Sequence, residues 1–235
     1  MDGSIDEGLA RRLLEEQHPD LAALPLHRAS VGSCNAIFRL GDQLAVRLPL
    51  HERAGASAGI EQTWLPWLSF RLTLPVPTPV RCGLPGRGYP WKWSVCPWLA
   101  GGTAIDVPVH EPLVVETMGP FLRSLHQPAP SSAPVQPNRG GPLVDQDGRF
   151  RSRLVRLCPP SLIRAITRVW EEALEARPNS GLSWVHGDLH LANILVRGGR
   201  PVAVLDFGDL SVGDPSVDMS LIWSLAHVED RERLW

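Results

Sequence analysis

Lysine is almost absent from this 235-residue sequence. Of its 23 basic residues only Lys92 is a lysine, and all the others are arginines. An enzyme mechanism that needs a lysine therefore has almost no position at which to place one, and an arginine has to supply the charge instead.

Cysteine is also scarce. Four cysteines, Cys34, Cys82, Cys96 and Cys158, lie far apart, without a C-x-x-C pair or a matching histidine cluster. This spacing argues against a zinc site and against a secreted domain held by disulfides, so a reducing cytoplasm fits best.

Long apolar runs and an excess of one charge are missing as well. No uninterrupted apolar segment approaches the roughly 20 residues that span a bilayer, and the first residues, MDGSIDEG, are acidic rather than basic. We therefore expect no export and no membrane partner. The formal net charge of −2 gives no chain-wide basic field for nucleic acid. A discrete small-molecule ligand is the better expectation.

The first hundred residues combine helices with antiparallel strands. Ser4 and Glu7 form a capping-box pattern, which predicts a helix up to His18. In residues 35–50 the side chains on either side of GDQ alternate between two faces, which predicts a β-hairpin. Residues 52–68 predict a helix that Pro66 kinks or ends early.

A connector and a hinge follow this helix. The alternate prolines of LPVPTPV favour an extended connector, and YPWKWSVCPWL is typical of a strand. Because AGG then interrupts the pattern, we expect an amino-terminal lobe over residues 1–100, with a hinge near 95–102, and a second lobe over 101–235.

The second lobe is predicted to be mainly helical. The patterns indicate helices at 111–126 and 161–176, with a long surface loop at 127–147 between them. A further helix is expected to begin at Asp214, with Trp223 in its buried stripe.

One short segment of this lobe carries the chemistry. NILV and VAVL flank RGGRP and predict a hairpin, so Asn193 before its first strand and Asp206 after its second should be neighbours. Asp188 lies on the loop that leads to the same end. Two carboxylates and an amide then converge, a set of hard oxygen donors that suits Mg²⁺ and phosphoryl transfer.

The segments VHGDLHLANILV and VLDFGDLSVGDPSVDMS resemble the catalytic segment of the aminoglycoside phosphotransferase family. Further blocks, among them CNAIFRLGDQLAVRLP and NRGGPL, extend the resemblance over most of the chain. It implies an α+β, protein-kinase-like two-lobed fold, with ATP or GTP and Mg²⁺ as cofactors and a small-molecule hydroxyl as acceptor. It further implies Asp188 as catalytic base, Asn193 and Asp206 as Mg²⁺ ligands, and His186 as a scaffold residue.

The same resemblance suggests where the nucleotide binds. Arg47 takes the place of the usual strand lysine, with Glu61 as its partner on the next helix. Ser33 and Asn35 lie in the expected phosphate-covering loop, and the adenine should bind a backbone N–H of Cys96 or Leu99, because Pro97 has none.

The acceptor is left open by the sequence. An aminoglycoside or related antibiotic, a metabolite such as homoserine, choline or a sugar, and a non-catalytic nucleotide-binding remnant are the alternatives. Family members usually continue past the last helix, so the second lobe is expected to be incomplete at its end, and nothing specifies an oligomeric state. We expect support roles for Asp209, Asp214 and Asp218. For Asp145, Asp147, Glu171 and Glu172 the alternatives are acid in the acceptor pocket, which would favour a polycation, and a solvated surface charge, which is the simpler interpretation.

Overall fold

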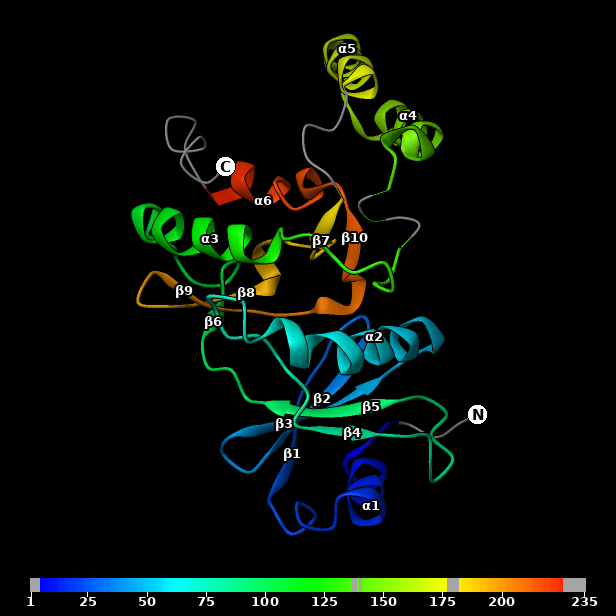
Figure 1. The fold of residues 1–235 in the computed structure, drawn as a ribbon, viewed down its shortest axis with the longest axis vertical. Coiled ribbons are helices and arrows are strands. Elements are labelled where there is room, and N and C mark those ends of the chain that lie inside the picture. Colours follow the sequence, from blue (N-terminus) through cyan, green and yellow to red (C-terminus); the bar gives the residue numbers. More distant parts are fainter. Residues whose placement is uncertain (1–4, 137–138, 140, 177–181, 226–235) are drawn as a thin grey trace.

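The computed structural model describes residues 5–136, 139, 141–176 and 182–225. Figure 1 shows an elongated molecule with a sheet-containing lobe at one end and a mainly helical lobe in the middle. Two further helices project at the other end. The predicted α+β class, with an antiparallel amino-terminal sheet, is confirmed.

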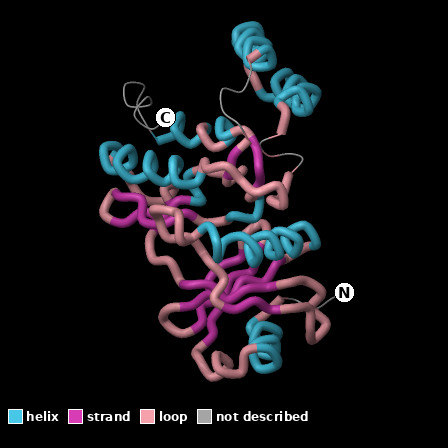
Figure 2. The backbone as a smooth tube through the Cα atoms, in the orientation of Figure 1, coloured by secondary structure: helices cyan, strands magenta, loops and turns pink. Residues whose placement is uncertain are grey.

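The amino-terminal lobe is built on one five-stranded antiparallel sheet in the order β1-β2-β3-β5-β4 (Figure 2). Its strands are β1 (Leu26–Val31), β2 (Asn35–Leu40), β3 (Leu44–Pro49), β4 (Arg81–Gly83) and β5 (Trp93–Pro97). The predicted hairpin at 35–50 is confirmed as β2 and β3, with Leu40 opposite Leu44 and Ile37 opposite Arg47.

Two helices accompany this sheet, and each departs from its prediction in one detail. Helix α1 (Glu7–Gln17) is capped by Asp6, whose carboxylate accepts a hydrogen bond from the Leu9 N–H at 2.8 Å. The predicted capping role of Ser4 is therefore wrong, and Ser4 itself lies outside the described residues. Helix α2 (Glu52–Leu68) continues two residues past Pro66, because a proline near the end of a helix removes only one hydrogen bond.

The second lobe contains a three-stranded antiparallel sheet, β6-β8-β9, and a separate antiparallel pair, β7 with β10. Its strands are β6 (Gly102–Thr103), β7 (Ser183–Val185), β8 (Ile194–Arg197), β9 (Arg200–Val204) and β10 (Ser211–Gly213). Its α-helices are α3 (Glu111–Leu125), α4 (Asp147–Leu157), α5 (Pro160–Glu175) and α6 (Ser220–Leu225). Its short 3-10 turns are η1 (Leu143–Gln146), η2 (Leu191–Asn193), η3 (Phe207–Asp209) and η4 (Pro215–Val217). Among the described residues, no helix has both the length and the apolar character needed to cross a bilayer.

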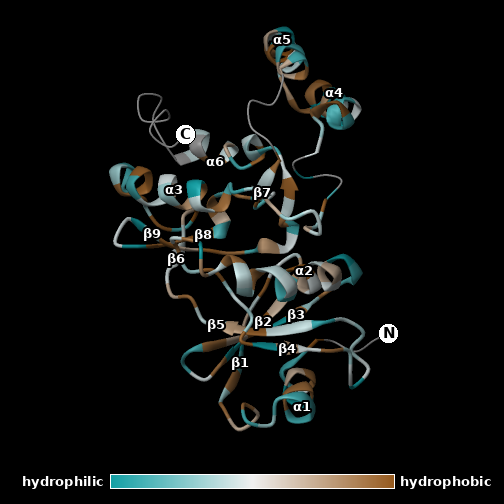
Figure 3. Cartoon of the chain, in the orientation of Figure 1, coloured by the Kyte–Doolittle hydropathy of each residue, from teal (hydrophilic) through white to brown (hydrophobic). Residues whose placement is uncertain are grey.

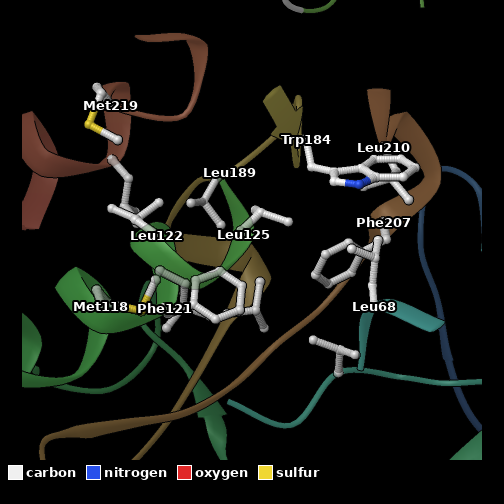
Figure 4. Packing of buried hydrophobic residues seen from close by; sticks show 14 of the residues in the cluster. Leu68, Met118, Phe121, Leu122, Leu125, Trp184, Leu189, Phe207, Leu210 and Met219 are labelled. Atoms are coloured by element: carbon white, nitrogen blue, oxygen red, sulfur yellow. The ribbon is translucent and has the colours of Figure 1, made fainter. Parts of the chain in front are cut away.

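Buried apolar side chains form two clusters. One lies in the amino-terminal lobe between α1 and the sheet and includes Leu13, Phe38 and Trp93. The other, seen in Figure 4, gathers α3 with Trp184 and Phe207 and also takes in Leu68 from α2. Apolar packing thus crosses residue 100, and the boundary placed there stays a prediction.

Helices α4 and α5 form the projecting pair. The predicted helix at 161–176 is confirmed as α5, whereas α4 follows a stretch predicted to be loop and was not predicted. Phe150 and Trp170 stack at 3.8 Å between ring centroids and join the two helices. Figure 3 shows hydrophobic and hydrophilic stretches side by side on both helices. Apolar side chains stay exposed on this pair, among them Val155 and Val169.

The segment after β10 differs from the predicted continuous helix. Asp214 does cap a helical turn, since its side chain accepts from the Ser216 N–H at 2.9 Å, but that turn is η4 and ends at Val217. Helix α6 begins only at Ser220. Trp223, predicted to be buried, is 68% exposed, whereas Leu221 is buried.

Candidate active site

The hairpin of β8 and β9 brings Asn193 and Asp206 together, as predicted. Ile194 pairs with Val204, and the Leu205 N–H donates to the Asn193 carbonyl at 2.8 Å, so Asp206 follows directly at the open end. The Asn193 side-chain amide donates to the Asp188 carbonyl at 2.9 Å. All three residues of the predicted catalytic set are therefore neighbours.

The side chains of Asn193 and Asp206 offer oxygen to a cation. The amide nitrogen of Asn193 faces the Asp188 carbonyl and His190 Nε2, at 2.9 and 3.3 Å, which leaves its Oδ1 as the available acceptor. Asp206 has a left-handed backbone (φ 59°), uncommon outside glycine, which begins the η3 turn. No group of three or more His, Cys, Asp or Glu forms a metal site among the described residues. One carboxylate and one amide oxygen fit Mg²⁺, which keeps water and phosphate oxygens as its other ligands.

His186 supports the loop that carries Asp188. It is fully buried, its Nε2 lies 2.8 Å from the Leu205 carbonyl, and its Nδ1 lies 3.2 Å from the Asp188 N–H. These distances assign the donor to Nε2 and the acceptor to Nδ1. The imidazole thus connects the loop to the strand end that precedes Asp206, in line with the expected scaffold role.

Asp218 supports the same loop from the other side. Its fully buried carboxylate accepts hydrogen bonds from the backbone N–H groups of His186 and Gly187, at 2.8 and 2.9 Å. It also contacts His126 Nε2 at 3.1 Å. The expected support role of Asp218 is confirmed by these contacts, which also account for the break between η4 and α6.

Arg139 joins two carboxylates beside this loop, and sequence reasoning assigned it no role. Its guanidinium lies 3.0 Å from Asp188 Oδ1 and 2.8 Å from Asp209 Oδ2. Arg53 of α2 also pairs with Asp209, at 3.0 Å. Asp209 is thereby confirmed as a support residue. The one hint in the sequence was that Arg139 belongs to NRGGPL, a block that resembles the family. The sequence does not show that this block lies next to Asp188.

Gly187 is required where Arg139 approaches. Its φ of +82° favours glycine, and an added Cβ would lie 2.5 Å from the Asp209 carbonyl and 3.2 Å from Arg139 Cβ. The loop, the η3 turn and Arg139 therefore pack without room for a side chain at this position.

Arg47 and Glu61 form the predicted ion pair between β3 and α2, with 2.9 Å between Nη1 and Oε2. Both side chains are largely buried. Burial alone would lower the pKa of Arg47, but the Glu61 carboxylate outweighs it and holds the pKa of the guanidinium above its ordinary value. Burial raises the pKa of Glu61, while Arg47 and the nearby Phe207 backbone N–H oppose this shift. Asp206 is the next carboxylate to influence both groups, so the pair lies close to Asp206.

The remaining predicted nucleotide contacts lie on the sheet. Ser33 lies in the turn between β1 and β2, and Asn35 is the first residue of β2; the Gly32 N–H donates to the Asn35 carbonyl at 3.0 Å. This turn lies near Arg47, because Asn35 pairs with Pro49, two residues beyond the Ile37 and Arg47 pair.

The hinge discriminates between Cys96 and Leu99. Trp98 donates to the Gln43 carbonyl at 2.7 Å, so in this antiparallel register Cys96 is the next hydrogen-bonded partner, opposite Ala45. The Cys96 N–H is therefore used within the sheet. The Leu99 N–H forms no hydrogen bond within the part of the chain that the structure describes, so it is the available donor.

A cavity of about 550 Å³ adjoins the catalytic loop on the side of α4 and α5, and Arg53 and Arg139 line it. None of the four acidic residues considered for an acidic acceptor pocket lines it. They add no acid to this cavity, which agrees with their simpler interpretation as surface charges.

Comparison with known proteins identifies the family. The profile described as "Phosphotransferase enzyme family" matches residues 26–234. An aminoglycoside 3'-phosphotransferase of Escherichia coli is 27% identical over 231 residues, covering 91% of this chain and 82% of that protein. One of Salmonella typhimurium is 27% identical over 140 residues, covering 56% of this chain and only about half (52%) of its own length.

Solved structures show the same fold. The complex of APH(2'')-IIIa with GDP and kanamycin superposes with a TM-score of 0.76 at 17% identity, covering 96% of this chain and 81% of that one. The macrolide 2'-phosphotransferase of Brachybacterium faecium superposes with a TM-score of 0.67 at 21% identity, covering 97% and 80%. The chain therefore belongs to the phosphotransferase enzyme family and has the protein-kinase-like fold of these enzymes.

Proposed function

We propose that this protein transfers the γ-phosphoryl group of a nucleoside triphosphate to the hydroxyl of a small molecule. The convergence of Asp188, Asn193 and Asp206, with Glu61 of the buried Arg47 and Glu61 pair bonded to the N–H of Phe207 directly after Asp206, is the observation that carries this proposal. Phosphoryl transfer depends mainly on positioning and on neutralising phosphate charge, which this arrangement of groups can supply.

Each residue has a distinct task in the reaction. Asp188 orients the acceptor hydroxyl and receives its proton as the oxygen bonds to the γ-phosphorus and the bond to the β,γ-bridging oxygen breaks, releasing the nucleoside diphosphate. Arg47, held by Glu61, binds the nucleotide phosphates, and the Leu99 N–H binds the base. Asn193 Oδ1 and Asp206 would hold Mg²⁺, and the metal would supply neutralisation of the phosphate charge.

The relatives suggest which acceptors to test first. They include enzymes of aminoglycosides and a macrolide, so an antibiotic hydroxyl is one proposal and a metabolite alcohol is the alternative. The relatives bind either guanine or adenine nucleotides, as GDP and ATP complexes, so both triphosphates belong in the assay. A nucleotide-binding remnant is less favoured, because the chain retains Asp188, Asn193, Asp206 and the buried ion pair.

The test is a panel of alcohols with Mg-ATP and Mg-GTP, scored by release of diphosphate and by the mass of the product. Asp188→Ala should lower turnover by about 10³-fold or more while nucleotide binding persists. Asp42→Ala, the same change at an exposed carboxylate in the β2–β3 turn, should leave turnover unchanged. Thermal stabilisation by Mg-ATP without any product would favour the remnant, and full turnover in Asp188→Ala would refute the assignment of the base.

A further inference from the structure

The cavity beside the catalytic loop is lined mainly by basic and apolar residues. It measures about 550 Å³, a size suited to a small organic ligand. Arg139 lines it and contacts Asp188 at 3.0 Å, and Arg53 lines it and contacts Asp209 at 3.0 Å. The proposed base therefore lies at the edge of this cavity.

Among the residues that the structure describes, four arginines and no carboxylate line the cavity. Two of them, Arg53 and Arg139, are neutralised by Asp188 and Asp209. Arg149 and Arg153 also line it, and among the described residues neither forms an ion pair. They lie four residues apart on α4, where like charges repel. A bound anion would relieve that repulsion and match the planar donors of both groups.

The rest of the lining is apolar. Phe150 and Leu154 lie on the same face of α4 as the two arginines, and Ile166 and Trp170 face them from α5. Phe150 and Trp170 stack nearly parallel, at an interplanar angle of 9°, and so present a preformed flat apolar surface. A ligand that matches this cavity carries an apolar group together with its anion.

Acidic residues near the cavity are occupied elsewhere. Asp147 accepts hydrogen bonds from Trp170 Nε1 at 2.6 Å and Arg151 Nε at 2.8 Å. The Trp170 bond is the main reason that the pKa of Asp147 lies below its ordinary value, with Arg151 adding to the effect. Arg151 also approaches Glu171, at 3.5 Å. These two carboxylates are therefore already paired with groups of α4 and α5.

We propose that this cavity binds the acceptor, and that the acceptor is an alcohol carrying a carboxylate or phosphate next to an apolar group. Arg149 and Arg153 bind the anion, the stacked rings bind the apolar group, and the hydroxyl reaches Asp188. The role as acceptor rests on the proposed phosphotransferase function. A polycationic aminoglycoside does not match a lining of this charge.

Calorimetric titration with matched probes tests the inference on the intact chain. Mandelate and mandelamide share a phenyl ring and a hydroxyl and differ in charge, phenyl phosphate supplies the other anion, and kanamycin supplies the polycation. Mandelate should bind about tenfold more tightly than mandelamide, since two charge-assisted contacts are at stake. Arg149→Gln with Arg153→Gln should remove that preference. Arg156→Gln with Arg164→Gln, two exposed arginines of the same helices that do not line the cavity, should keep it.

The outcomes separate this inference from the proposed function. Equal binding or no binding of mandelate and mandelamide, tighter binding of kanamycin than of mandelate, or an unchanged preference in the double variant would overturn it. The ratio of phenyl phosphate to mandelate affinity tells which anion is preferred. If mandelate binds through the two arginines while no alcohol is ever phosphorylated, the cavity assignment stands and the phosphotransferase proposal fails. If kanamycin is phosphorylated and mandelate binds no more tightly than mandelamide, the phosphotransferase proposal stands and the cavity assignment fails.

Discussion

Asp218→Asn is the substitution for which the structure gives the most definite expectation. The fully buried carboxylate accepts from two backbone N–H groups, those of His186 and Gly187, and contacts His126. Asparagine keeps the shape but replaces one oxygen with an NH₂ group. In either orientation at least one buried N–H then faces a donor, which costs about 2 kcal/mol.

That loss has two measurable effects. For a chain of this length, about 2 kcal/mol corresponds to a fall of roughly 4–8 °C in Tm, measurable by circular dichroism. Because the same bonds hold the loop of Asp188, kcat should fall by about 10²-fold while the KM for nucleotide changes little.

Asp214→Asn is the matched control. It removes the same charge from the same segment, but Asp214 only caps η4, and asparagine caps equally well. If Asp218→Asn had the Tm and kcat of Asp214→Asn, the role assigned to Asp218 would be refuted.

Two further outcomes follow from buried groups of the amino-terminal lobe. Arg47→Ala leaves Glu61 buried without its partner and should lower the free energy of unfolding by about 3–5 kcal/mol in urea titrations. Arg47→Lys keeps the charge and should lower the free energy of unfolding much less. Equal losses in the two variants would contradict the pairing. Burial raises the pKa of the Cys96 thiol to about 12, from 9.0 when unfolded, so at pH 8 only about 10⁻⁴ of it is thiolate. Iodoacetamide should therefore label Cys96 only after denaturation, as peptide mass mapping would show, and prompt labelling of the folded protein would contradict this burial. Because the folded pKa is the higher one, the thiol contributes stability below about pH 9 that is lost as the pH rises toward 12.

The hairpin was predictable because its geometry is local. Two short apolar runs joined by Gly198 and Gly199 can close in few ways, and closure fixes Asn193 beside Asp206. The Arg47 and Glu61 pair was inferred from family resemblance, and the structure shows the contact itself.

Contacts between distant segments were not predictable in this way. Helix α4 was not predicted because its apolar pattern is short: Phe150, Leu154 and Leu157 recur at helical spacing over only two turns, and Leu154 is its only buried residue. Arg139 and Asp188 are far apart in the sequence but form an ion pair, and no local sequence pattern predicts that contact. Asp218 was expected to lie in the first turn of a continuous helix. Its carboxylate instead points inward and binds the backbone N–H groups of His186 and Gly187, and the helical segment is interrupted there. Only the position of these two partners, which the sequence does not give, explains the interruption.

Helix α2 has a mechanical consequence, because it is fastened to both lobes. Gln62 donates to the Trp93 carbonyl of β5 at 2.7 Å, while Leu65 and Leu68 belong to the hydrophobic cluster of the second lobe. The helix therefore cannot swing away with one lobe without breaking contacts to the other. Because β3 pairs with β5, the bond from Gln62 also keeps Glu61 of α2 beside Arg47 of β3, so the ion pair stays assembled when the rest of the second lobe moves.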